Sequence, residues 1–118
     1  MKRDVMLYLK DILDALESAE TFVRGLSYNQ FVRDDKTVSA VIRKLEIVGE
    51  AARQIPEDLR AKHPEVPWRQ MAEMRNRLIH AYFKVHYPLV WSTIRDRIPQ
   101  LKPLIARVLA DMKDTAGT

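Results

Sequence analysis

The sequence predicts an all-α fold, an up-and-down bundle of four to five helices. Three observations support this prediction. Apolar residues recur at helical spacing along most of the chain, and no segment shows the alternation typical of strands. Only three glycines occur, and all six prolines lie from Pro56 onward, where they separate helical segments. With 118 residues the chain has the length of one domain. We expect a helical domain over 1–113 and a disordered tail over 114–118.

The first half of the chain predicts two long helices. The first covers 5–26 with one apolar stripe, and Gly25 and the following SYNQF segment end it and form a short connection. Asp34 or Asp35 can cap the second helix. Gly49 within that helix marks a close helix crossing, because glycine is otherwise unfavourable there. The core face of the second helix is predicted to consist of Val38, Val41, Leu45, Val48, Ala52 and Ile55.

Prolines punctuate the second half. Pro56 opens a short helix over PEDLRAKH, and a third major helix is predicted from Trp68 through His80. Pro88 suits the start of a fourth helix. Pro99 and Pro103 are expected to break or kink that helix before a last one.

Composition excludes several classes of protein. Cysteine is absent, which excludes disulfide scaffolds, thiolate metal sites and thiol nucleophiles. No apolar run approaches the roughly 18 residues of a membrane span, and the N-terminus does not resemble a signal peptide, so we expect a cytoplasmic protein without membrane contact. Eight basic and two acidic residues lie between Arg69 and Arg107, a net charge of +6. A basic second half permits an anionic partner such as RNA or a nucleotide, without demanding one.

The segment RNRLIHAY, residues 75–82, carries the most information. On a continuous helix Arg75 falls in the middle of the apolar arc, with Tyr82 beside it. A charge there is costly unless it is paired or reaches a polar cleft. Arg75 could therefore pair with Glu46 or Glu50 on a neighbouring helix, or lie in a crevice that binds an anion.

The other polar residues of this helix would lie on the opposite face. Asn76 and His80, four residues apart, would share that face, and Arg77 would form a surface pair with Glu73. His63 precedes Pro64 in a turn and is expected to be exposed. The three histidines do not have the spacing of a metal site, so we expect no metal and no cofactor.

RNRLIHAY resembles the signature of the HEPN superfamily (higher eukaryotes and prokaryotes nucleotide-binding), in the form seen in HepT-like toxins. The resemblance extends to DKT and AVIRKLEIVGEAA over 35–52, to Pro67 and Trp68 before the motif, and to Val90 and Trp91 after it. It covers most of residues 5–110.

The resemblance implies a metal-independent endoribonuclease that forms a homodimer, with two Arg75–His80 pairs lining one cleft. It implies the toxin of a type VII-like toxin–antitoxin pair. The antitoxin would be a minimal nucleotidyltransferase that transfers AMP onto Tyr82.

The residues suit such chemistry. Glu73 is the only carboxylate near the motif, whereas metal-dependent nucleases use several. A metal-free route instead uses the RNA 2′-hydroxyl as nucleophile and needs an acid, a base and a cation. His80 would be the acid or base, Arg75 would hold the phosphate, and Asn76 would position the phosphate or sugar. The alternative is a non-catalytic module that binds a nucleotide or partner, or a scaffold in which the motif only stabilises a dimer.

Overall fold

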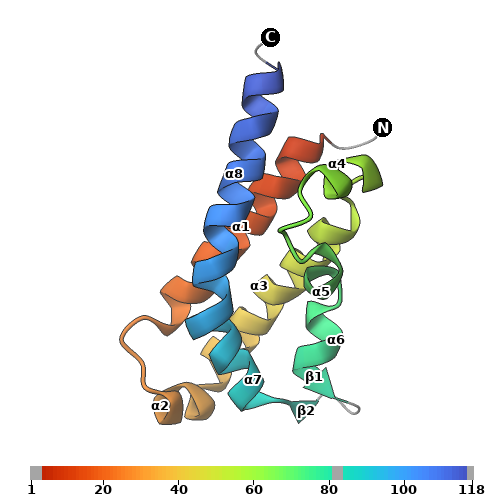
Figure 1. Ribbon diagram of the computed structural model, residues 1–118. Helices are drawn as coiled ribbons and strands as arrows, with labels where there is room; N and C mark the ends of the chain where they lie inside the picture. The colour runs from red at the N-terminus through yellow and green to blue at the C-terminus, as the bar shows by residue number, and fades with distance from the viewer. Residues whose placement is uncertain (1–3, 81–83, 117–118) are drawn as a thin grey trace.

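The computed structural model describes residues 4–80 and 84–116 and confirms the all-α prediction. Three helices of 19 residues each dominate the fold: α1 (Val5–Val23), α3 (Asp35–Arg53) and α8 (Ile98–Ala116). Figure 1 shows them side by side, with α1 beginning and α8 ending at the same end of the molecule. The last turn of α8 lies in the segment 114–118, which the sequence assigns to a tail.

Shorter elements connect the long helices (Figure 1). Between α1 and α3 lies α2 (Tyr28–Arg33). After α3 come α4 (Glu57–Lys62), α5 (Trp68–Ala72) and α6 (Met74–Leu78), followed by strands β1 (Ile79–His80) and β2 (Lys84–Val85). The antiparallel pair β1–β2 is the only sheet in the described residues. α7 (Tyr87–Ser92) and the π-helical turn η2 (Thr93–Arg97) lead into α8.

The ends of the first helices follow from local chemistry. Gly25 adopts a φ of 83°, a left-handed conformation that favours glycine, just after α1 ends. The connection after it contains a helix that the sequence analysis missed: Ser27 and Gln30 form a reciprocal capping box that starts α2. Asp34 caps α3 by accepting a hydrogen bond from the Thr37 backbone N–H. Because Thr37 donates from its hydroxyl and its backbone, the pKa of Asp34 lies below its ordinary value.

The expected break at Pro99 and Pro103 is wrong in position. α8 passes through both prolines, and the irregular turn precedes them as η2. The Ile98 N–H bonds to the Thr93 carbonyl, five residues back. Pro99 then lies in the first turn of α8, where its missing N–H is tolerated.

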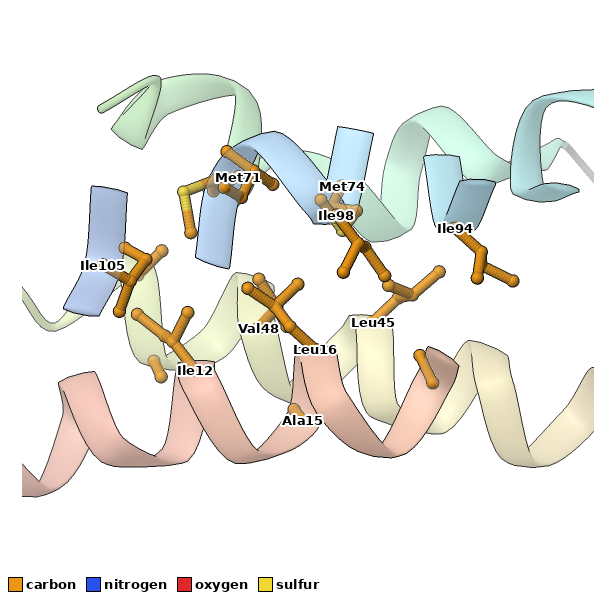
Figure 2. Close-up of a cluster of buried hydrophobic side chains, with 14 of the residues drawn as sticks. Ile12, Ala15, Leu16, Leu45, Val48, Met71, Met74, Ile94, Ile98 and Ile105 are labelled. Atoms are coloured by element: carbon orange, nitrogen blue, oxygen red, sulfur yellow. The ribbon is translucent and has the colours of Figure 1, made fainter. Parts of the chain in front are cut away.

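One apolar core lies between the three long helices and the α5–α6 segment. Figure 2 shows side chains from α1, α3, α5, α6, η2 and α8 converging there, among them Leu16, Leu45, Met71 and Ile98. The six residues predicted for the core face of the second long helix are all buried, although the last of them, Ile55, lies two residues beyond the end of α3. An ion pair of 2.8 Å between Lys102 Nζ and Glu20 Oε1 joins α8 to α1. No helix in the described part of the chain is long and apolar enough to cross a membrane.

The predicted close crossing at Gly49 is confirmed. A Cβ atom at this position would lie 3.3 Å from the carbonyl oxygens of both Met71 and Ala72. The backbone of α3 therefore approaches the backbone of α5, and this contact holds the segment that leads into the motif.

Candidate functional site

The motif segment is not one continuous helix. The helical path is interrupted at Glu73, which has φ −94° and ψ 6°, and α6 ends at Leu78. Ile79 is extended, and the His86 N–H donates to the Leu78 carbonyl at 2.9 Å. The N–H of the residue that follows β2 thus bonds to the last carbonyl of α6, and the chain leaves the helix. The predicted helix through His80 is wrong for this reason.

This ending separates His80 from the helix that carries Asn76. The predicted shared helical face of these two residues is therefore wrong. His80 lies in β1, where its backbone pairs with Lys84 across the hairpin. The side chain of His80 and the whole of Tyr82 lie outside the described residues.

Arg75 lies at the surface and is not buried in an apolar arc. Its side chain is 46% exposed, and its Nε atom lies 3.7 Å from Glu46 Oε2 on α3. This is one of the two carboxylates that the sequence offered as partners. Glu46 is 25% exposed and also lies 3.8 Å from Arg43 Nη1, so two guanidinium groups share this carboxylate.

The ion pair between Arg75 and Glu46 is weak because its atoms lie far apart. Charge-assisted hydrogen bonds are typically about 2.7–2.9 Å long, well short of the distance between Arg75 and Glu46. Exposed ion pairs contribute about 0–1 kcal/mol. A phosphate could therefore compete with Glu46 for Arg75 at little cost.

The expected ion pair between Arg77 and Glu73 does not form. Glu73 pairs with Arg69, with 3.6 Å between Oε1 and Nε, and no ion pair joins Glu73 to Arg77. Asn76 and Arg77 are exposed. Arg77 lines a groove between α6 and the α7–α8 segment, two residues from Arg75 and hence on another side of the short helix.

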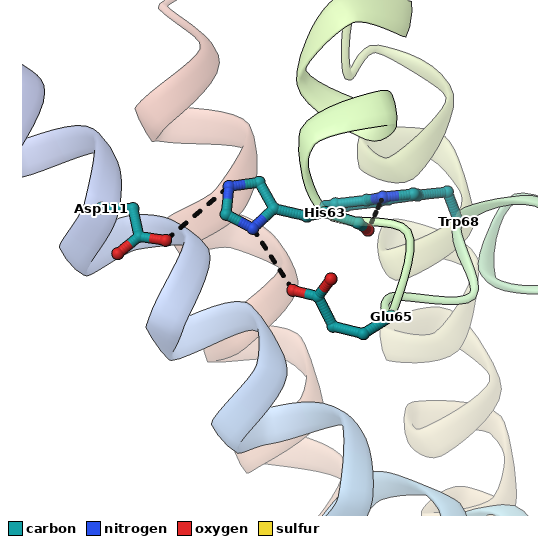
Figure 3. A network of polar contacts seen from close by, with 4 residues as sticks. All are labelled: His63, Glu65, Trp68 and Asp111. Atoms are coloured by element: carbon teal, nitrogen blue, oxygen red, sulfur yellow. Dashed lines mark hydrogen bonds and ion pairs between the residues drawn. The ribbon is translucent and has the colours of Figure 1, made fainter.

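His63 is buried, at 8% exposure, which overturns the expectation of an exposed turn residue. Figure 3 shows its ring between Glu65 and Asp111: Nδ1 lies 3.3 Å from Glu65 Oε1, and Nε2 lies 3.9 Å from Asp111 Oδ2. Its carbonyl accepts a hydrogen bond from Trp68 Nε1 at 3.1 Å. The pKa of Glu65 is lowered, first by its own backbone N–H and then by His63. These contacts tie the α4–α5 connection to α8.

Trp68, Trp91 and His86 each have structural contacts. Trp68 is buried in the core, whereas Trp91 is half-buried against Phe31 and Tyr28, with the Arg95 guanidinium 5.5 Å from its ring centre. His86 caps α7, since its Nδ1 accepts from the Leu89 N–H. Among residues 4–80 and 84–116, no group of three or more His, Asp or Glu is placed to hold a metal ion.

The sequence analysis did not predict two features near the motif, the contact of Arg43 with Glu46 and the position of Arg97 beside Arg77. It did not place Arg43 beside Glu46, although the spacing of three residues on one helix was a readable signal. It also did not bring Arg97 to the groove beside Arg77. That approach depends on how η2 packs, and the sequence carried no sign of a π-helical turn.

The fold and site together define a helical domain in which the short helix α6 exposes Arg75 and Asn76. Residues 12–108 match the family model described as "Ribonuclease HepT-like", so the match includes Arg75, Asn76, His80 and Tyr82. The chain belongs to this family, as the resemblance predicted.

Relatives support the same family. The chain is 51% identical over 102 residues to "Probable ribonuclease HepT" of Thermococcus cleftensis, covering 86% of this chain and 93% of that protein. It is 44% identical over 101 residues to "Putative RNase MJ1380" of Methanocaldococcus jannaschii, covering 86% and 93%. It is 42% identical over 106 residues to "Putative RNase TTE0752" of Caldanaerobacter subterraneus, covering 90% and 95%. No solved structure matches the chain.

Proposed function

We propose that this protein is a metal-independent endoribonuclease, in which Arg75 and His80 are catalytic and Asn76 positions the RNA. The observation that carries the proposal is the family match, which spans the whole Arg75–His80 motif. The exposed, weakly paired guanidinium of Arg75 supports it, because a catalytic cation must be able to reach phosphate.

The reaction follows from the chemistry of these groups. The RNA 2′-hydroxyl attacks the adjacent phosphorus and loses its proton to a base, while the bond from phosphorus to the 5′-oxygen breaks. An acid protonates the leaving 5′-oxygen, which leaves a 2′,3′-cyclic phosphate and a 5′-hydroxyl. Histidine serves as acid or base near neutral pH, and Arg75 stabilises the charge that develops on the phosphate oxygens. Asn76, exposed next to Arg75, would hold the phosphate or the sugar.

The active unit we propose is a homodimer. One chain supplies a single motif histidine, whereas this reaction uses both an acid and a base. A two-fold dimer would supply two histidines and two arginines to one cleft. Because α6 ends at Leu78, His80 of one chain is not held to the helical face of its own Asn76.

The biological role we propose is that of a cytoplasmic toxin controlled by a minimal nucleotidyltransferase antitoxin. Transfer of AMP from ATP to the Tyr82 hydroxyl, with release of pyrophosphate, would place a bulky anion two residues beyond His80, and so would block RNA by charge and by volume. The family resemblance supports this role. Mass spectrometry of the protein after incubation with the antitoxin and ATP tests it: we expect added AMP on Tyr82, and modification that persists in Tyr82→Phe would refute the assignment.

Cleavage of labelled RNA in excess EDTA tests the nuclease. We expect wild-type protein to leave cyclic-phosphate ends, and Arg75→Ala and His80→Ala to reduce cleavage by about a hundredfold or more. Arg69→Ala is the matched control, since Arg69 is exposed, lies on the adjacent α5 and pairs only with Glu73 among the described residues.

A binding module is the second candidate, because the exposed guanidinium of Arg75 could bind a phosphate without any cleavage of the RNA. RNA that binds but is not cleaved by wild-type protein would favour this candidate. Cleavage that is equal in wild type, Arg75→Ala and His80→Ala would refute the catalytic assignment.

A further inference from the structure

A groove of about 290 Å³ lies on the side of α6 that Arg77 occupies. The segments around it are α5 and α6 on one side and α7, η2 and the start of α8 on the other. Its apolar lining consists of two half-buried residues, Pro67 and Leu89, and of four buried ones, Met71, Met74, Leu78 and Leu101. The groove is separate from the Arg75–Glu46 pair, which lies toward α3.

Two arginines give this groove a positive charge. Arg77 reaches it from α6 and Arg97 from η2, and no carboxylate is among its lining residues in the described chain. Arg97 Nη2 donates to Gln70 Oε1 at 2.9 Å, so its guanidinium is held across the groove toward α5. The remaining N–H groups of a guanidinium form a planar fork that suits phosphate oxygens.

An apolar floor beneath two guanidinium groups fits a ligand that is flat at one end and anionic at the other. Thioether and leucine side chains pack against aromatic rings, and arginine binds phosphate bidentately. The volume of about 290 Å³ lies just below the roughly 300–1,000 Å³ range of small-molecule sites, so the groove holds at most one nucleotide.

We propose that this groove binds one unpaired nucleotide of the RNA, with the base against Leu89 and Met74 and the phosphate between Arg77 and Arg97. The proposal rests on the proposed ribonuclease function and assigns that function a substrate subsite. Leu78 lines the groove and is followed directly by Ile79 and His80. RNA held here therefore lies beside the segment that leads to the catalytic histidine, and the groove would select which base is accepted next to the cleaved bond.

The methionine methyl groups provide a direct test. Met71 and Met74 line the groove, whereas Met6 and Met112 lie elsewhere in the core and serve as internal controls. We expect ring-current shifts of the Met71 and Met74 methyl resonances in methyl-labelled wild-type protein on titration with a 2′-O-methyl tetranucleotide, which cannot be cleaved. Met6 and Met112 should not shift. Resonances are assigned with single Met→Leu variants.

Charge variants test the phosphate contact. We expect Arg97→Gln and Arg77→Gln each to weaken tetranucleotide binding by about tenfold and to reduce its salt dependence. Arg95→Gln is the matched control for Arg97, because Arg95 is in the same π-helical turn but lies over Trp91. Arg69→Gln is the control for Arg77. Equal affinity in all four variants, or silent Met71 and Met74 methyls at saturation, would overturn the proposal.

Three further outcomes distinguish the sources of the ligand and the two proposals. Shifts produced by a 5′-mononucleotide and not by the tetranucleotide would assign the groove to a free nucleotide and overturn the RNA subsite. If the methyl groups respond but wild-type protein does not cleave RNA, the groove stands and the nuclease fails. If RNA is cleaved through Arg75 and His80 while the methyl groups stay silent, the nuclease stands and the groove fails.

Discussion

Gly49 offers a test of how the fold positions the motif. Two opposing effects determine the result of Gly49→Ala. Alanine gains about 1 kcal/mol of helix propensity over glycine in a helix interior. Its methyl group, however, would lie 3.3 Å from two backbone carbonyl oxygens of α5, closer than an unstrained contact. Backbone oxygens cannot rotate away as a side chain does, so α3 and α5 would have to separate.

The magnitude follows from the same contacts. Overpacking of this kind typically costs about 1–3 kcal/mol, so we expect a net loss of about 1 kcal/mol after the gain in helix propensity. For a domain of this length the loss corresponds to a fall in Tm of about 4 °C. The separation of α5 should also displace α6, so cleavage activity should fall by more than the loss of folded protein explains.

Urea denaturation and thermal melting measure the loss. Ser39→Ala, an exposed position on the same helix, is the control and should gain a few tenths of a kcal/mol. If Gly49→Ala stabilises the protein by the full 1 kcal/mol expected from helix propensity alone, the two backbones can separate freely, and the reasoning is refuted.

Three other predictions concern single contacts. Glu46→Gln should tighten binding of a 2′-O-methyl oligonucleotide several-fold at low salt, because Arg75 and Arg43 lose their shared carboxylate. Fluorescence anisotropy measures the affinity, and an unchanged affinity would contradict this. The pKa of Asp34 is lowered in the folded state, so its contribution to stability is present above the ordinary aspartate pKa of about 3.9 and is lost as pH falls through the lower folded value. The variant Asp34→Asn retains the cap and should flatten the acid limb of a curve of stability against pH. An unchanged acid limb would exclude this contribution. Trp68→Phe should cost about 0.5–1.5 kcal/mol in urea denaturation, because the His63 carbonyl loses the Trp68 Nε1–H and keeps only the Val66 N–H at 3.2 Å, and unchanged stability would contradict this.

The long helices were predictable because burial is periodic along them. The six apolar residues predicted at helical spacing from Val38 to Ile55, along α3 and just beyond its end, are all buried. Local rules also narrowed the cap of α3 to Asp34 or Asp35 and identified the stop at Gly25 and the close approach at Gly49, since each depends on one residue type in one backbone geometry. The Ser27–Gln30 capping box follows an equally local rule, and the pattern was present in the sequence but was not used.

The end of α6 was not predictable from local pattern. The apolar spacing continues through Ile79, and nothing in RNRLIHAY is a helix stop. The stop depends on a bond from the His86 N–H to the Leu78 carbonyl, eight residues apart in the chain. His63 was misjudged for a related reason: its burial depends on Asp111 of α8, which the sequence separates from it by most of the second half of the chain.

The short length of α6 separates the position of His80 from the positions of Arg75 and Arg77. Arg75 and Arg77 lie on the same five-residue helix yet face different surroundings, one the carboxylate of Glu46 on α3 and the other the groove beneath Arg97. A longer helix would carry His80 on a fixed face, tied to one of these two sides. Because the chain leaves the helix at Ile79, the position of His80 depends on the β1–β2 hairpin and not on the helical rotation that sets Arg75 and Arg77. Substitutions that alter the hairpin, such as at Lys84 or Val85, should therefore reduce cleavage while leaving oligonucleotide binding at Arg77 and Arg97 intact.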